Sequence, residues 1–325
     1  MLVCMGQSTA ATNPIVIQSR DIEILRGLFE SRVMTASHIA GLFFNGSGEA
    51  AKKRLQALKA AGLVTERPRK TFELAVLHLA QAGLNTLAKR GILKDYPPFE
   101  KPVLENRGRV SDITLRHELE VMDVKVAFYC KARTSERFSI VEFTTWPRLN
   151  EFVCARTSAR IKPDGFIRIR ENGTGGCTTV HALFLELDRS TETQSVLLHR
   201  ATCYLDHYRS GGFARRFGAE RSQYKNHPFR VLYVLQTEER RNNIAERLLR
   251  CHPPLLTQVW LTTSRQITTD PFGAIWIRPV DYQNAIASSP FTKLPIGPGY
   301  PRNSDRERFL QLQAKLHPLF PPMQV

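Results

Sequence analysis

Three carboxylates lie on two neighbouring apolar segments of the chain. Asp164 follows Pro163 at the start of the first segment, and Glu186 and Asp188 lie near the end of the second. Carboxylate oxygens are hard ligands, so a cluster of them favours a cation such as Mg²⁺. A metal ion held by Asp164 and Glu186 would polarise a phosphodiester and activate water. These residue types therefore predict a metal-dependent catalytic site.

The two segments are expected to be strands of one hairpin. Residues 161 to 170 and 180 to 188 are apolar, and the glycine-rich stretch 172 to 176 between them favours an antiparallel connection. If the turn is centred on Gly175, Asp164 lies opposite Glu186, because each is eleven residues away. Side chains alternate along a strand, so Glu186 and Asp188 share one face.

Other residues could complete this site. Glu118 or Glu120, on the long helix expected before the hairpin, could add a metal ligand. Arg200, on the helix expected after it, could supply a positive charge beside the acids. Tyr204 and Tyr208 on that helix could be nucleophiles of a relaxase, but their helical spacing beside Leu205 is more typical of core residues. An unpaired carboxylate inside an apolar strand is costly, so Glu186 needs a partner of some kind.

The charge of the chain predicts a polyanionic partner. Its 325 residues carry a formal net charge of +16, which favours double-stranded DNA. The six cysteines form no Cys-x-x-Cys pair, which argues against structural zinc and a disulfide framework. We find no apolar run of roughly 18 residues and no basic amphipathic helix, so we expect a cytoplasmic protein that does not bind membranes.

Residues 20 to 92 have the pattern of a winged helix-turn-helix domain. Helices are expected over 20 to 30, after the N-cap Thr35, and over 49 to 61, followed by strands over 63 to 66 and 71 to 77. The last helix, 81 to 90, is expected to pack on the first helix or to mediate a homodimer.

In such domains the third helix enters the major groove and the hairpin contacts phosphates. The predicted DNA-binding residues in this domain are Lys52, Lys53, Arg54, Gln56, Arg67, Arg69 and Lys70. The alternative is that the basic residues of the helix are only its solvated face.

Residues 111 to 285 are expected to form a second domain, after a linker over 93 to 110. The expected order is a helix over 111 to 133, a strand over 138 to 144, the acidic hairpin, a helix over 192 to 209 and a strand over 230 to 237. A charged helix over 238 to 251 and strands over 259 to 263 and 274 to 277 follow. The tail, 286 to 325, is rich in proline and glycine and is expected to contain a short helix from Asp305 to about Leu316.

This order is that of a restriction-endonuclease-like domain. The predicted fold class is therefore mixed α/β, a winged helix followed by such a domain. Nucleases of this fold carry a lysine where this chain has Asp188, so Arg189 or Arg200 would have to substitute for it. The basic, aromatic stretch that includes Arg215, Arg216 and Phe217 could grip DNA near the acids, or it could be a solvated loop.

The chain resembles the replication-relaxation family of plasmid and integrative-element proteins. The resemblance covers most of residues 20 to 282. It is carried by Arg32-Val33-Met34-Thr35, by Arg54 to Leu58 with Gly62-Leu63-Val64, by His117-Glu118, by Pro163-Asp164-Gly165, and by Phe184 to Glu192, with Tyr204 and Tyr208. It implies a role in plasmid replication, DNA relaxation or mobilisation. A transcriptional regulator with an inactive nuclease-like domain is the alternative.

Overall fold

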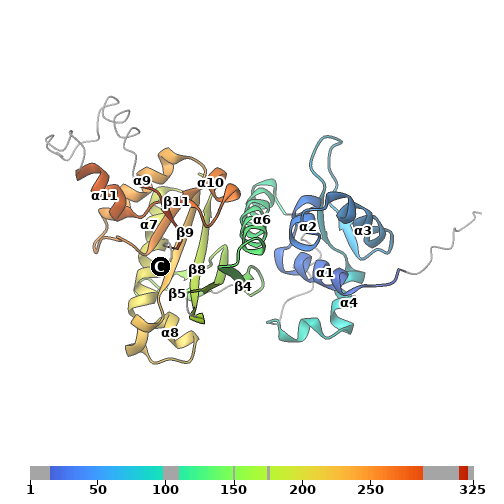
Figure 1. The fold of residues 1–325 in the computed structure, drawn as a ribbon, viewed down its shortest axis with the longest axis horizontal. Coiled ribbons are helices and arrows are strands. Elements are labelled where there is room, and N and C mark those ends of the chain that lie inside the picture. The colour runs from blue at the N-terminus through green and yellow to red at the C-terminus, as the bar shows by residue number, and fades with distance from the viewer. Residues whose placement is uncertain (1–14, 98–109, 149–150, 174–175, 288–314, 321–325) are drawn as a thin grey trace, which may run out of the picture. The chain divides into compact units, whose positions relative to one another are not determined.

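The computed structural model describes residues 15–97, 110–148, 151–173, 176–287 and 315–320. These residues form two compact units, the first reaching Tyr96 and the second made of Pro97 and the described residues from Val110 onward (Figure 1). Each unit combines helices with a sheet, so the predicted mixed α/β class is confirmed. Within the described residues, no helix is both long enough and apolar enough to cross a membrane.

Four α-helices lie in the described part of the first unit, and local capping explains where two of them start. They are α1 (Ser19–Ser31), α2 (Ala36–Phe43), α3 (Gly48–Ala60) and α4 (Gln81–Lys89). The Thr35 side chain accepts a hydrogen bond from the backbone N–H of His38 and caps α2, as predicted. The Ser47 side chain caps α3 in the same way. A turn of 3-10 helix, η1 (Ile92–Asp95), follows α4.

A small antiparallel sheet completes this unit. Its strands are β1 (Met34–Thr35), β2 (Val64–Glu66) and β3 (Val76–Leu79), in the order β1-β3-β2. The prediction of a strand from residue 71 was wrong, because residues 71–75 belong to the loop of the β2–β3 hairpin. Glu73 N donates to Lys70 O at 3.0 Å, which bends the loop before pairing resumes at Val76.

The second unit is built on a five-stranded sheet that follows the helix α6 (Asp112–Arg133). The strands are β4 (Phe138–Thr144), β7 (Gly165–Asn172), β8 (Thr178–Asp188), β9 (Phe229–Leu235) and β10 (Val259–Thr263). Their order is β10-β9-β8-β7-β4. β4, β7 and β8 pair antiparallel, whereas β8, β9 and β10 run parallel.

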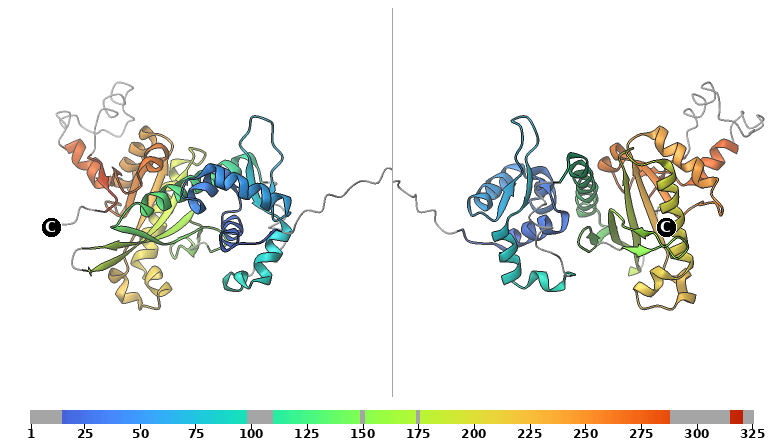
Figure 2. Two further views of the ribbon diagram at one scale, coloured as in Figure 1. Left: turned by 45° about the vertical axis from the view of Figure 1, so that its right-hand side comes forward. Right: turned by 180° about the vertical axis from the view of Figure 1, so that it is seen from behind.

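Helices cover both faces of this sheet (Figures 1 and 2). Alternation along β8 sends Phe184 to the core shared with α7 (Gln194–Arg209) and α9 (Glu238–Leu249). Leu183 and Leu185 enter the opposite core, which contains Phe128 of α6 and Ile267 of α10 (Ser264–Thr269). Residues at even positions of β8 therefore face α7.

The remaining elements are short. They are β5 (Phe152–Val153), β6 (Arg160–Ile161), α8 (Gly212–Arg216), η4 (Arg221–Asn226), β11 (Ala274–Trp276), α11 (Pro279–Ala287) and β12 (His317–Pro318). The sequence did not predict α8, α10 or α11. Apart from Lys315 and Leu316, which are not helical, the helix expected in the tail lies outside the described residues.

We predict that Gly83→Ala destabilises the first unit by about 1–3 kcal/mol, because a Cβ would overpack a closed site. A Cβ at Gly83 would lie 2.3 Å from the backbone oxygen of Leu63 and 2.7 Å from Leu79 Cδ1. Gly48→Ala is the matched control, since a Cβ there meets no atom within 4 Å. Urea unfolding measures both changes, and equal midpoints for the two variants would contradict the prediction.

Candidate functional site

The strand register brings Asp164 and Glu186 together, as predicted. Gly165 pairs with Leu185, and Asp164 N donates to Leu185 O at 2.9 Å. Glu186 and Asp188 both face α7, with only 2% and 4% of their surfaces exposed. Burial of two carboxylates in one strand requires partners for both, because a charge taken out of water is costly.

Asp164 is held by one donor at each carboxylate oxygen. His117 Nε2, from α6, lies 2.9 Å from Asp164 Oδ1, and the backbone N–H of Leu187 donates to Oδ2 at 2.7 Å. Burial alone would lower the pKa of His117. The contact with Asp164, with smaller contributions from Glu118 and Glu120, raises that pKa instead. The contact with Asp164 therefore favours the charged form of His117.

Glu186 is held in the same way, by two residues of α7. Arg200 Nη1 donates to Oε2 at 2.9 Å, and the Tyr204 hydroxyl donates to Oε1 at 2.6 Å. Burial, and then the charge of Asp164, raise the pKa of Glu186 to about 8, although Arg200 and Tyr204 oppose that rise. Tyr204 is fully buried and bound to Glu186, so it is a core residue, the alternative that the sequence favoured.

Asp188 has partners of its own. Arg240, near the start of α9, forms a salt bridge with Oδ2, and Ser190 N donates to Oδ1 at 3.1 Å. Arg240 Nη2 also donates to the backbone oxygen of Glu192 at 2.6 Å, and Arg200 Nη2 donates to the Glu192 side chain at 3.0 Å. Arginines from two helices thus balance the acids at this end of β8.

The two other candidate ligands serve different contacts. Glu120 accepts hydrogen bonds from Arg189 Nε and from Gln236 Nε2, both at 2.9 Å. Glu118 acts on His117 through its charge. Arg189 therefore forms its salt bridge with Glu120. The cation beside Glu186 is Arg200.

The carboxylates of this site are already paired within the chain. Every carboxylate oxygen of Asp164 and Glu186 already accepts a hydrogen bond, and the positive charge beside Glu186 belongs to Arg200. In the parts of the chain that the structure describes, no group of three or more His, Cys, Asp or Glu side chains is placed to hold a metal ion. The contacts that the structure shows here are hydrogen bonds and ion pairs among residues of the chain.

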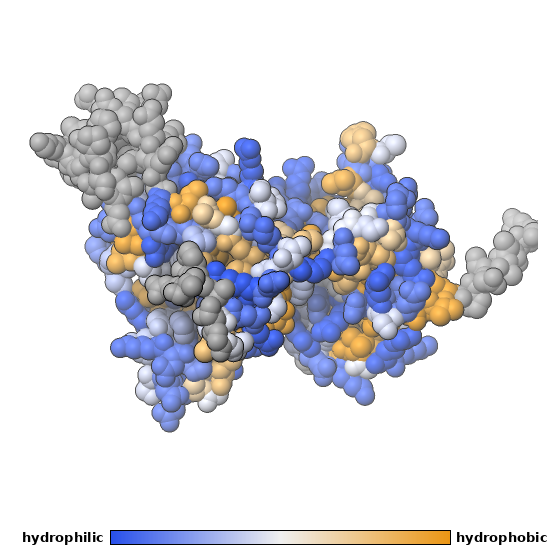
Figure 3. All heavy atoms as spheres, in the orientation of Figure 1, coloured by the Kyte–Doolittle hydropathy of each residue, from blue (hydrophilic) through white to orange (hydrophobic). Residues whose placement is uncertain are grey.

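On α3, three of the four predicted DNA-binding residues are exposed. Lys52, Lys53 and Gln56 lie on the solvent side, and Figure 3 shows hydrophilic side chains over this helix. Arg54 is placed differently, because its guanidinium forms a salt bridge with the buried carboxylate of Asp21 and donates to the backbone oxygen of Val16 at 2.8 Å. Arg54 therefore joins α3 to α1.

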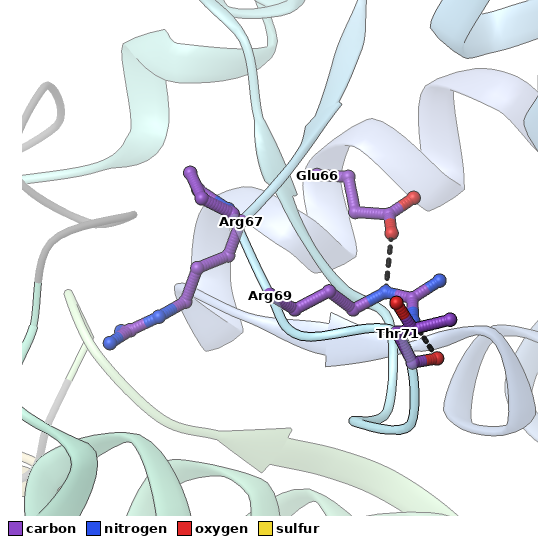
Figure 4. Close-up of a pocket in the computed structure, with 5 residues that line it drawn as sticks. Glu66, Arg67, Arg69 and Thr71 are labelled. Carbon is purple, nitrogen blue, oxygen red and sulfur yellow. Dashed lines mark hydrogen bonds and ion pairs between the residues drawn. The ribbon is translucent and has the colours of Figure 1, made fainter.

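The three predicted hairpin residues also divide into different roles. Arg69 Nε donates to Glu66 Oε1 at 2.8 Å, so this side chain is part of the hairpin itself. The Arg67 side chain extends away from that pair (Figure 4). Lys70 is exposed beside them.

Arg215 and Arg216 are exposed on α8, which follows α7. α7 starts after the carboxyl end of β8, where Glu186 and Asp188 lie, and its 16 residues lead to α8 at the opposite end of the sheet (Figure 1). That this basic, aromatic stretch grips DNA near the acids therefore stays a prediction.

Comparison with known proteins identifies the family. The replication-relaxation family matches residues 25–220, which is 196 of the 325 residues and includes parts of both units. The chain belongs to the replication-relaxation family. No curated protein and no solved structure matches it. The acidic residues, His117, Arg200 and Tyr204 all fall within the matched range, whereas Arg240 lies beyond it.

Membership of the replication-relaxation family indicates a role in the replication or relaxation of plasmid or mobile-element DNA. Sequence reasoning missed His117 and Arg240 as partners of the acids. Topology could have suggested Arg240, since β8 and β9 are parallel neighbours and the helix after β9 starts beside the end of β8.

We predict that Glu186 makes the protein less stable as pH rises. A carboxyl whose pKa is raised on folding stabilises the folded state fully below its ordinary value of 4.5, and that stabilisation is lost as pH rises to about 8. Glu186→Gln should remove this part of the pH dependence. Urea unfolding at pH 5 and pH 8 measures it, with exposed Glu238→Gln as the control. Equal loss of stability in wild type and Glu186→Gln would contradict the prediction.

Proposed function

We propose that this protein is a DNA-binding factor in the replication or relaxation of plasmid or mobile-element DNA, and that its first unit binds duplex DNA as a winged helix. The observation that carries this proposal is the division of α3 into two faces. Leu55 and Leu58 are buried in the unit, whereas Lys52, Lys53 and Gln56 are exposed. Exposed cations on a helix of this length are suited to phosphates and base edges in a major groove.

The surroundings of α3 support the proposal. The β2–β3 hairpin follows α3 directly and carries Arg67 and Lys70, so a basic loop flanks a basic helix. The net charge of +16 favours a polyanion over a neutral partner. Arg54 is left out of the proposed contact surface because Asp21 holds it.

The second unit is proposed to be an endonuclease-like domain that has kept the fold and holds its acids with internal cations. Its three antiparallel strands followed by two parallel strands support this assignment. Arg215 and Arg216 are exposed on α8, and we propose that they contact phosphates of the bound DNA.

We predict that Lys52→Glu/Lys53→Glu weakens duplex binding at least tenfold at moderate salt and lowers the salt dependence of binding by about two phosphate contacts. The measurement is fluorescence anisotropy with a labelled duplex over a series of salt concentrations. Lys89→Glu/Arg90→Glu, which changes two exposed cations at the end of α4, is the charge-matched control. Equal loss in both double variants would mean that only net charge matters, and α3 would not be the binding surface.

Metal-dependent nicking is the second candidate function, because the register places Asp164 opposite Glu186. On the DNA-binding proposal, supercoiled plasmid incubated with the protein and Mg²⁺ or Mn²⁺ stays supercoiled, because Arg200 and Tyr204 hold Glu186. Nicking by the wild type that disappears in Asp164→Asn and in Glu186→Gln would instead establish an enzyme. Agarose gels distinguish the two results.

A further inference from the structure

The tip of the β2–β3 hairpin presents two large apolar side chains to solvent. Phe72 is 86% exposed and Leu74 is 75% exposed. The hairpin projects from the first unit (Figure 1), and apolar atoms lie at its end (Figure 3). Most large apolar side chains elsewhere in this unit pack into its core, so this pair calls for an explanation.

The loop is shaped by polar contacts rather than by packing of these two side chains. Arg69 donates to Glu66 Oε1 at 2.8 Å and, through Nη1, to the backbone oxygens of Glu73 at 2.8 Å and Thr71 at 3.3 Å (Figure 4). Lys70 N donates to the Glu73 carboxylate at 3.1 Å. The backbone around Phe72 is therefore fixed without any contribution from its ring, which leaves the ring available to a ligand.

The charge around the tip indicates which ligand fits. Residues 67–74 contain three cations, Arg67, Arg69 and Lys70, and one anion, Glu73. An apolar tip flanked by net positive charge suits a polyanion that also offers an apolar interior. Duplex DNA has this combination, because phosphates line the minor groove and apolar base faces become accessible when a step at its floor is opened.

We propose that Phe72 and Leu74 form an apolar wedge that enters the minor groove, partly unstacks one base step and bends the duplex. The inference rests on the proposed function, since α3 in the major groove would hold the neighbouring hairpin against the adjacent backbone. Lys70 and Arg67 then contact phosphates beside the wedge. Unstacking costs a few kcal/mol per step, which the added contacts of a bent duplex offset.

The test uses the full chain with Phe72→Ala/Leu74→Ala and a duplex labelled at both ends. Energy transfer between the labels reports bending, and anisotropy over a salt series reports affinity. We expect the variant to bind about tenfold more weakly and to lose the bend, while its salt dependence stays unchanged, because no phosphate contact is removed. Lys70→Gln should show the opposite pattern, with a salt dependence lower by about one contact and the bend retained.

Two controls keep the test decisive. Ile113→Ala changes an apolar side chain that is 66% exposed in the second unit and should leave binding and bending unchanged. The thermal midpoint of Phe72→Ala/Leu74→Ala should match that of the wild type, since neither side chain packs in the core.

Wild-type binding and bending by this variant would overturn the wedge and leave the proposed function intact. The wedge would also be overturned if this variant lost self-association in sedimentation while its DNA binding stayed unchanged, because the tip would then join two copies of the chain. Absence of duplex binding by the wild type would instead remove the proposed function.

Discussion

A carboxylate inside an apolar sheet must be neutralised, and this constraint organises the second unit. Glu186 is buried on the α7 face of β8, where Arg200 and Tyr204 contact it. Removing one partner of a buried pair typically costs about 3–5 kcal/mol, so α7 is fastened to the sheet at this point. Asp188 and Arg240 fasten α9 in the same way. The acids of this unit hold its helices in place.

Much of the fold could be predicted because its signals are local. The bounds of β4 and β10 match the expected strands, and those of α6 match the expected helix to within one residue. The hairpin register followed from counting to a glycine-rich turn. The start of β3 was mispredicted because residues 71–75 alternate like a strand, whereas their apolar members point into solvent. Alternating apolar and polar residues predict a strand only where one side of the segment packs against a core.

The site was predictable only where register determines it. Asp164 and Glu186 are paired by the turn between them, so their proximity could be foreseen. Their side-chain donors come from α6 and α7, and Asp188 depends on Arg240 of α9, 52 residues further along the chain. Sequence spacing also assigned Arg54 to the outer face of α3, because nothing local indicates that the buried Asp21 needs a cation. Partners of buried charges are decided by tertiary packing, which one sequence does not reveal.

The salt bridge between Arg54 and Asp21 also affects the energetics of the surface that α3 presents. It joins α3 to α1, so the orientation of α3 within the first unit is set when that unit folds. The conformational entropy of fixing this helix is then lost during folding and not again when a ligand arrives. A ligand on the outer face of α3 meets a preorganised surface, so its association need not wait for a rearrangement of the helices.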